Sequence, residues 1–83
     1  MYEVIISKRA FKQICKLEKN IQEKILKVLE RIRIRPEAYI TKLVGYPAYK
    51  VRVGDYRIIL DLDKEKLMIL VIKVGHRSNI KRK

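Results

Sequence analysis

A chain of 83 residues, 48% of them hydrophobic, is long enough for one compact core and too short for two, so residues 1–83 are expected to form a single domain. Its 21 Lys and Arg against 9 Asp and Glu give a net charge of +12, which predicts a polyanionic partner: nucleic acid first, with an anionic membrane surface or an acidic protein as alternatives. No apolar stretch approaches the roughly 20 residues that span a bilayer and no signal peptide is evident, so the expected location is the cytoplasm, away from membranes.

The first part of the chain has the pattern of a strand followed by two amphipathic helices. Residues 2–6 are rich in β-forming side chains and predict a short strand, after which Ser7 is placed to cap a helix. Asn20 and Glu23 resemble a capping box that starts a second helix, and Pro36 ends it. The helically spaced apolar positions are Ala10, Phe11, Ile14 and Leu17, then Ile21, Ile25, Val28, Leu29 and Ile32.

A loop and a β-hairpin are expected next. Residues 37–48 contain glycine and proline and are expected to form the loop. From residue 49 to residue 60, apolar and polar side chains alternate on both sides of Gly54-Asp55. This alternation predicts a hairpin with a two-residue turn, and glycine at the first turn position favours type II′.

The last predicted strand is the most apolar. Residues 61–66 are polar and are expected to form a turn, and residues 67–74 are apolar apart from Lys73. Such a run is typical of a central strand that is covered on both faces, here ended by Gly75 and followed by a basic tail over residues 76–83.

The order of elements is therefore β-α-α-β-β-β. This order indicates an α+β fold in which an N-terminal helical hairpin packs on one face of a mostly antiparallel four-stranded sheet. The other face must carry the strand residues that point away from the helices.

The hairpin register gathers cations on that other face. A two-residue turn at Gly54-Asp55 sets Arg52 opposite Arg57, and Lys50 lies two residues along on the same face. Like charges that are directly opposite destabilise a sheet, which favours a bound anion; the alternative is that these strands simply present solvated cations. A lysine among cations gives up its proton more readily and can act as a general base, and the guanidinium fork suits a phosphorane transition state.

Metal chemistry is not expected. The chain has one cysteine, Cys15, and one histidine, His76, so it has no zinc site of normal ligand count and no internal disulfide. Its few carboxylates are scattered, and most lie beside lysines. The sequence therefore predicts no metal and no cofactor.

The segment YKVRVGDYRII, residues 49–59, resembles the central signature of the RelE/ParE toxin superfamily. Lys42-Leu43 with Gly45 resembles the family's Lys-Leu-x-Gly segment, and residues 74–77 resemble the end of its last strand. The resemblance covers nearly the whole chain and implies a RelE-like fold. It also implies a type II toxin of the RelE branch: a metal-independent endoribonuclease that cleaves mRNA in the ribosomal A site and so inhibits translation.

The resemblance implies a reaction and roles for basic residues. The RNA 2′-hydroxyl would attack the adjacent phosphate, leaving a 2′,3′-cyclic phosphate and a 5′-hydroxyl. Lys50 and Arg52 would lie near the 2′-hydroxyl. Arg57 would stabilise the phosphate, and Arg77 the phosphate or the leaving group.

Other residues are assigned lesser roles. His76 and Lys81 are auxiliary candidates, although His76 also fits a solvated turn histidine. Many relatives stack a tyrosine on a base where this chain has Lys81, so that stacking is not expected here; Tyr39 and Tyr46 are candidates to replace it, although nothing in the sequence requires this. Further RNA contacts are expected from Lys42, Lys73, Arg82 and Lys83.

The expected partners are an acidic, RelB-like antitoxin, mRNA in the ribosomal A site, and rRNA. Two other functions remain open. A ParE-like protein of the same fold would bind and inhibit a topoisomerase without ribonuclease activity. A plain RNA-binding module would use exposed strand aromatics as stacking platforms, and the sequence lacks a pair of them.

Overall fold

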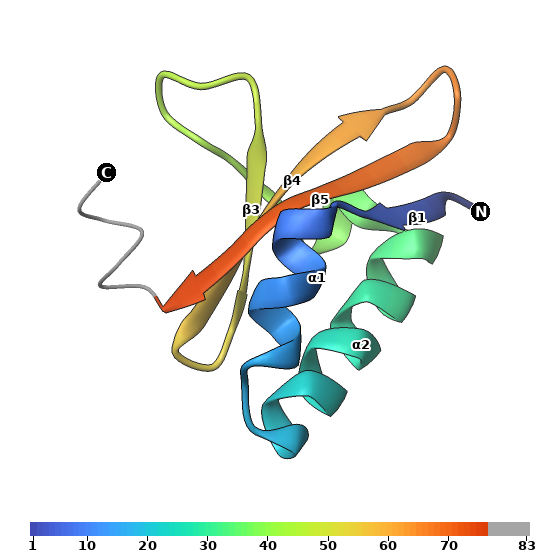
Figure 1. Ribbon diagram of the computed structural model, residues 1–83. Coiled ribbons are helices and arrows are strands. Elements are labelled where there is room, and N and C mark those ends of the chain that lie inside the picture. Colours follow the sequence, from blue (N-terminus) through green and yellow to red (C-terminus); the bar gives the residue numbers. More distant parts are fainter. Residues whose placement is uncertain (77–83) are drawn as a thin grey trace.

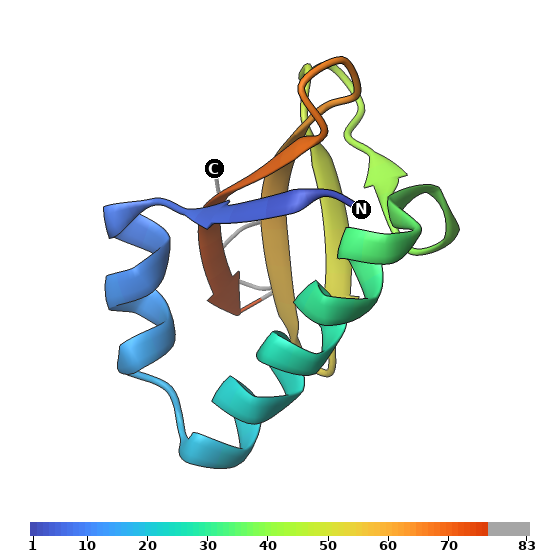
Figure 2. The same cartoon turned by 90° about the vertical axis from the view of Figure 1, so that its right-hand side faces the viewer.

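The computed structural model describes residues 1–76 and consists of a layer of two helices against one face of a five-stranded sheet (Figures 1 and 2). This arrangement confirms the expected α+β fold, with one strand more than the four expected. The elements are β1 (Glu3–Ile6), α1 (Lys8–Cys15), α2 (Lys19–Ile34), the 3-10 turn η1 (Pro36–Ala38), β2 (Thr41–Lys42), β3 (Tyr49–Val53), β4 (Tyr56–Asp63) and β5 (Met68–His76).

The sheet has the strand order β1-β5-β4-β3-β2. Only the pairing of β1 with β5 is parallel; the other pairs are antiparallel. The β3–β4 hairpin has the predicted register, with Arg52 opposite Arg57. Gly54 has a φ of 61° and Asp55 has a negative φ, as the expected type II′ turn requires.

Side chains of α1 occupy the edge of β5 that β1 leaves open. Strand β1 pairs only with residues 68–71 of β5. Beyond that point, the Ser7 hydroxyl donates to the carbonyl oxygen of Ile72 (2.8 Å), and the side-chain oxygen of Gln13 accepts from the N–H of Val74 (2.7 Å). The Ser7 hydroxyl oxygen also accepts from the N–H of Ala10, so one residue caps α1 and attaches it to the sheet.

Helix α2 begins differently from the prediction. The expected capping box at Asn20 and Glu23 is wrong: the N-cap is Glu18, which makes no side-chain capping bond. Asn20 lies within the helix and its side-chain oxygen accepts from the neighbouring N–H of Ile21. The Gln22 side-chain amide instead donates to the carbonyl oxygen of Leu17 (2.9 Å). This bond links α2 to the segment between the two helices.

The strands are longer than predicted, because cross-strand pairing overrides local propensity. The expected loop over residues 37–48 contains the short strand β2, and β4 continues to Asp63 instead of turning at residue 61. Gly75 does not break β5, since it is paired with Arg57. Covering of β5 on both faces is also wrong, because Leu70 is 39% exposed on the face without helices.

The core lies between the helices and the sheet. Buried apolar side chains of α1 and α2 meet the inward-facing residues of β3, β4 and β5, and none of the described buried residues is polar or charged. Its members are Ala10, Ile14, Ile25, Leu29, Ile32, Val51, Val53, Ile58, Leu60, Ile69, Val71 and Val74. Both helices lie on one side, so the opposite face of the sheet is available for function (Figure 2).

Candidate nucleic-acid interface

Two cross-strand rows place cations on the face of the sheet that the helices leave open. In the first row, Lys50 of β3 is opposite Ile59 of β4, and Ile59 is opposite Lys73 of β5. In the second row, Arg52 is opposite Arg57. We call Lys50, Arg52, Arg57 and Lys73 the cationic patch.

An apolar side chain lies at the centre of this patch. Ile59 is only 6% exposed, although the strand register puts it on the outer face between Lys50 and Lys73. Long basic side chains cover apolar surface with their methylene stems and keep their charged ends in water. The register thus flanks the buried isoleucine with two lysines, whose stems are long enough to shield it.

The patch has no internal counter-ion within the described residues. Over residues 1–76 the ion pairs are Arg33–Glu30 (3.2 Å) and Lys64–Glu37 (3.7 Å), and neither involves the patch. Four neighbouring cations that form no ion pair with a described carboxylate therefore attract a polyanion, and guanidinium groups bind phosphate through paired N–H donors. The arrangement suits the backbone of an RNA or DNA strand.

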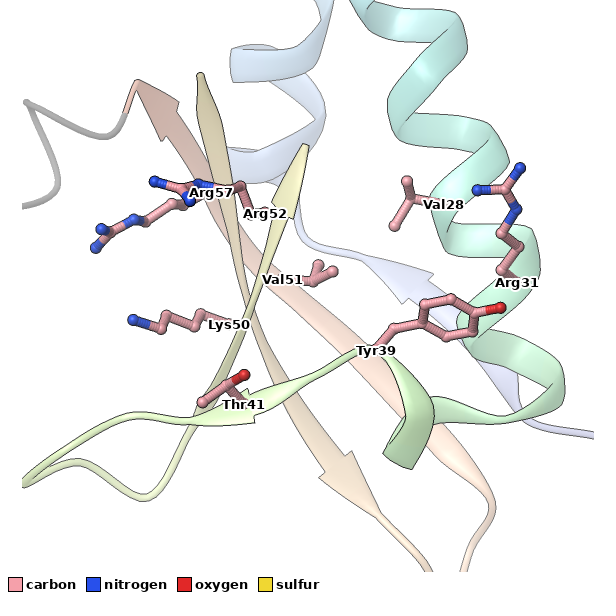
Figure 3. A pocket seen from close by; sticks show the side chains of 8 residues that line it. All are labelled: Val28, Arg31, Tyr39, Thr41, Lys50, Val51, Arg52 and Arg57. Atoms are coloured by element: carbon pink, nitrogen blue, oxygen red, sulfur yellow. The ribbon is translucent and has the colours of Figure 1, made fainter. Parts of the chain in front are cut away.

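A cleft of about 460 Å³ lies beside the patch, where β3 passes α2. Lys50, Arg52 and Arg57 extend from the outer face of the sheet, whereas Val51 points towards α2 (Figure 3). The cleft therefore spans the edge of β3 and reaches from the cations to the helical layer. Its lining residues are Val28, Arg31, Tyr39, Thr41, Lys50, Val51, Arg52 and Arg57.

The structure separates some of the other predicted residues from the patch. Lys42 is opposite Tyr49. Because Tyr49 and Lys50 are neighbours in β3, they point to opposite faces, so Lys42 belongs to the helical side of the sheet. His76 is opposite Tyr56, likewise out of phase with Arg57, and its ring meets that of Tyr56 edge to face at 5.4 Å. Arg77, Lys81, Arg82 and Lys83 lie outside the described residues.

Metal ligands do not gather in the part of the chain that the structure describes. There, no three His, Cys, Asp or Glu side chains form a group that could hold a metal ion. Over the same residues, no helix has both the length and the apolar character needed to cross a membrane.

Sequence reasoning missed the cleft and the buried centre of the patch. The alternation of the hairpin puts Ile59 on the outer face, and nothing in the sequence indicates that it is buried there. Arg31 and Tyr39 come from α2 and from the residue after η1, and only the tertiary fold brings them to β3. The one available signal for Arg31 was its place on the polar side of the predicted helix.

The chain is similar to toxins of known families. The profile of the family described as "ParE toxin of type II toxin-antitoxin system, parDE" matches residues 4–81. The chain is 32% identical over 80 residues to the mRNA interferase toxin RelE of Escherichia coli (strain K12), covering 93% of this chain and 84% of that protein. Its structure resembles a chain of the intact E. coli RelBE toxin-antitoxin complex, with a TM-score of 0.79, 32% identity and coverage of 92% of this chain and 96% of that one. It also resembles a chain of the archaeal RelE-RelB complex of Pyrococcus horikoshii OT3, with a TM-score of 0.80, 28% identity and coverage of 92% and 94%.

Proposed function

Because this chain belongs to the ParE toxin family of type II toxin-antitoxin systems, and to the RelE-like branch of the RelE/ParE superfamily, we propose that it is an endoribonuclease toxin that cleaves mRNA on the ribosome. Its relative in E. coli is named an mRNA interferase, and that activity is the one proposed for this chain. Cleavage of mRNA in the ribosomal A site would inhibit translation, and contacts to rRNA would hold the toxin there. We place this activity in the cytoplasm, where translating ribosomes are.

The observation that supports cleavage best is the directly opposed pair Arg52 and Arg57 on the uncovered face of the sheet. A cross-strand pair of like charges costs stability, and no described carboxylate offsets it. A phosphate between the two guanidinium groups would remove the repulsion. The pair is therefore suited to the additional negative charge that develops on a phosphorane.

The proposed reaction is an attack of the 2′-hydroxyl oxygen on the adjacent phosphorus. The 2′-hydroxyl loses its proton, the bond from phosphorus to the 5′-oxygen breaks, and that oxygen takes up a proton to leave a 5′-hydroxyl. Lys50 and Arg52 are assigned to the side of the 2′-hydroxyl and Arg57 to the phosphate oxygens. Arg77 is assigned to the phosphate or the leaving oxygen. The identity of the general base is left open between the basic residues, with His76 and Lys81 as auxiliary candidates.

Lys73 joins the proposed RNA-binding surface, because it lies in the same cross-strand row as Lys50. Lys42, which lies in the register of the other face, is retained as a contact to rRNA only, together with Arg82 and Lys83. The proposed reaction uses no metal, because guanidinium and ammonium groups supply positive charge at the phosphate.

The proposed protein partner is an acidic, RelB-like antitoxin. Solved complexes of RelE-like chains with RelB antitoxins come from E. coli and from P. horikoshii. Acidic side chains opposite the cationic patch would both bind the toxin and hide its cations from RNA. Bulk added by the antitoxin would also prevent the toxin from reaching the A site.

The deciding experiment incubates the protein with ribosomes translating a defined mRNA and maps the new 5′ ends. We expect cleavage within the A-site codon, and no cleavage when a 2′-deoxynucleotide replaces the nucleotide 5′ to the scissile phosphate. Arg9→Ala, on the exposed surface of α1, is the matched control for Arg57→Ala. Intact mRNA together with inhibited DNA supercoiling by a topoisomerase would instead favour the ParE-like activity.

A further inference from the structure

An exposed tyrosine, Tyr39, lines the cleft on the side of α2, across from the cationic patch. Figure 3 shows the ring of Tyr39 extending towards Arg31 of α2, whereas Lys50, Arg52 and Arg57 extend from the other face of the sheet. Tyr39 is 47% exposed and is not among the partly buried apolar residues, within residues 1–76, that pack against the core. Its ring is therefore available to a ligand.

Hydrogen bonds and core packing position the backbone around Tyr39. Pro36 is fully buried, and its carbonyl accepts from the N–H of Tyr39 (3.0 Å) and from that of Ile40 (3.1 Å). Ile40 packs against the core on the other side of Tyr39. A tyrosine with fixed neighbours and an exposed ring loses little further entropy when a flat ligand stacks on it.

Arg31 provides a cation on the same side of the cleft. It is exposed, and no carboxylate of the described residues pairs with it. Val28 and Val51 give this part of the cleft an apolar floor. An aromatic wall, an apolar floor and an unpaired guanidinium together fit a nucleotide, which has a flat base and a phosphate.

We propose that Tyr39 and Arg31 form a binding site for one nucleotide of a single-stranded RNA, in which the base stacks on Tyr39 and Arg31 contacts a phosphate. The proposal deepens the proposed function and rests on it: the strand would cross the edge of β3, with the scissile phosphate at the cationic patch and a neighbouring nucleotide in the cleft. A duplex does not fit this site, because a paired base cannot present its face to the ring.

The shape and charge of the cleft favour RNA over a segment of a protein partner. Four of its eight lining residues are basic and none is acidic, and its apolar floor consists of two valines. Single-stranded nucleic acid sites combine such a charged groove with aromatic side chains on which bases stack. A peptide bound mainly by apolar burial would need a larger apolar floor.

The test measures the affinity of the purified protein for a single-stranded 2′-O-methyl RNA of about ten nucleotides, which cannot be cleaved by 2′-hydroxyl attack. Loss of one stacked base typically weakens binding by a factor of roughly 5 to 150, so we expect Tyr39→Leu to fall in this range. Tyr39→Phe keeps the ring and should bind like the wild type. Phe11→Leu, at an exposed aromatic residue of α1 outside the cleft, is the matched control.

The salt dependence of RNA affinity distinguishes the contribution of Arg31 from that of Tyr39. Arg31→Gln should reduce the slope of log affinity against log salt by about 0.7, the value expected when one contact to a single-strand phosphate is lost. Tyr39→Leu should leave this slope unchanged. A base-free nucleotide at one position of the RNA should weaken wild-type binding as much as Tyr39→Leu does, and should have no further effect on that variant.

The outcomes are distinguishable. Unchanged affinity of Tyr39→Leu, or failure of the wild type to bind the RNA, overturns the nucleotide site, as does loss of antitoxin binding in that variant with RNA binding intact. The base-free RNA tests the same site without altering the protein, in case Tyr39→Leu does not fold. A wild type that binds RNA in this way but does not cleave mRNA on ribosomes contradicts the proposed function and leaves the site standing.

Discussion

At the scale of the residue, the cross-strand pair Arg52–Arg57 is expected to lower the stability of the sheet and to favour phosphate binding. The two-residue turn at Gly54-Asp55 fixes them opposite each other, and neither forms an ion pair with a described carboxylate. A like-charged cross-strand pair is destabilising, and favourable cross-strand pairs set the scale at roughly 0.2–1 kcal/mol. Such a pair is suited to a ligand that carries the opposite charge.

Neutralising one arginine should therefore stabilise the protein. We expect Arg52→Gln to raise the free energy of unfolding by about 0.5 kcal/mol at low ionic strength and to lower cleavage activity. Arg9→Gln on α1 removes the same charge away from the pair and serves as control. Urea denaturation at low salt and near 1 M salt measures both, since about 1 M salt screens charges beyond roughly 3 Å. Equal stabilities of the two variants at low salt would refute the repulsion.

Removing the guanidinium groups assigned to the phosphate should abolish toxicity without unfolding the protein. We expect Arg57→Ala and Arg77→Ala to lower the cleavage rate by roughly 10² to 10³, as is found when one donor to a developing oxyanion is lost. Growth assays and ribosome cleavage assays measure the effect, and thermal melts check the fold. Full toxicity in both variants, with wild-type melting temperatures, would exclude these assignments.

The same residues should act without a divalent ion. We expect cleavage of ribosome-bound mRNA to persist in excess EDTA, because the positive charge at the phosphate comes from side chains. Ribosomes need magnesium, so the intactness of the ribosomes must be verified by sedimentation in the same buffer. If activity is lost on chelation and restored by one divalent ion while ribosomes stay intact, the cationic mechanism is wrong.

At the scale of the element, α1 acts as a cover for the edge of β5. Its N-cap Ser7 bonds to the carbonyl of Ile72, and Gln13 accepts from the N–H of Val74. Open strand edges pair with other chains, so covering an edge protects against aggregation. The same bonds fix the end of β5, where Lys73 of the cationic patch lies.

The Gln13 bond gives a prediction about stability. Gln13→Leu should lower the free energy of unfolding by about 1–3 kcal/mol, because the N–H of Val74 loses the acceptor that Gln13 provides. Gln13→Glu keeps an acceptor oxygen at the same length and is the matched control. Chemical denaturation measures both variants, and equal stabilities would show that water replaces the bond without cost.

Elements whose determinants are local could be predicted from the sequence, and those fixed by distant pairing could not. Gly54-Asp55 sets the hairpin register locally, so the placement of Lys50, Arg52 and Arg57 on one face followed from sequence and is confirmed. Strand β2 has two residues and exists through its pairing with β3. Gly75 stays in β5 through its pairing with Arg57.

The candidate site was predictable to the same extent. Lys73 lies level with Lys50 only because β4 and β5 shift register between Ile59 and Leu60, an irregularity that no local pattern in the sequence indicates. The cleft needs α2, η1 and β3 together, so Arg31 and Tyr39 could not be assigned to it in advance.

At the scale of the whole molecule, the net charge of +12 predicts an acidic partner. We expect the product of the neighbouring gene to be acidic, to co-purify with this protein, and to bind it more weakly as salt is raised. Combined substitution of Lys50, Arg52 and Arg57 by Gln should weaken the complex and flatten its salt dependence. A neutral or basic partner would contradict the prediction, as would a complex that leaves these cations exposed and adds no bulk that blocks the A site.

The parallel pairing of β1 with β5 also has a consequence for the synthesis of the protein, because the sheet cannot be completed until β5 has been made. Glu3 pairs with Met68, so the first strand to be made waits for a strand that follows 65 residues later. At about 5–20 residues per second, translation needs roughly 3–13 s for that stretch. The β3–β4 hairpin forms from local contacts and brings together Lys50, Arg52 and Arg57. Lys73, the remaining member of the cationic patch, joins them only when β5 pairs with β4. We therefore expect a nascent chain to stay inactive until β5 has been made, which gives the cell those seconds to provide antitoxin.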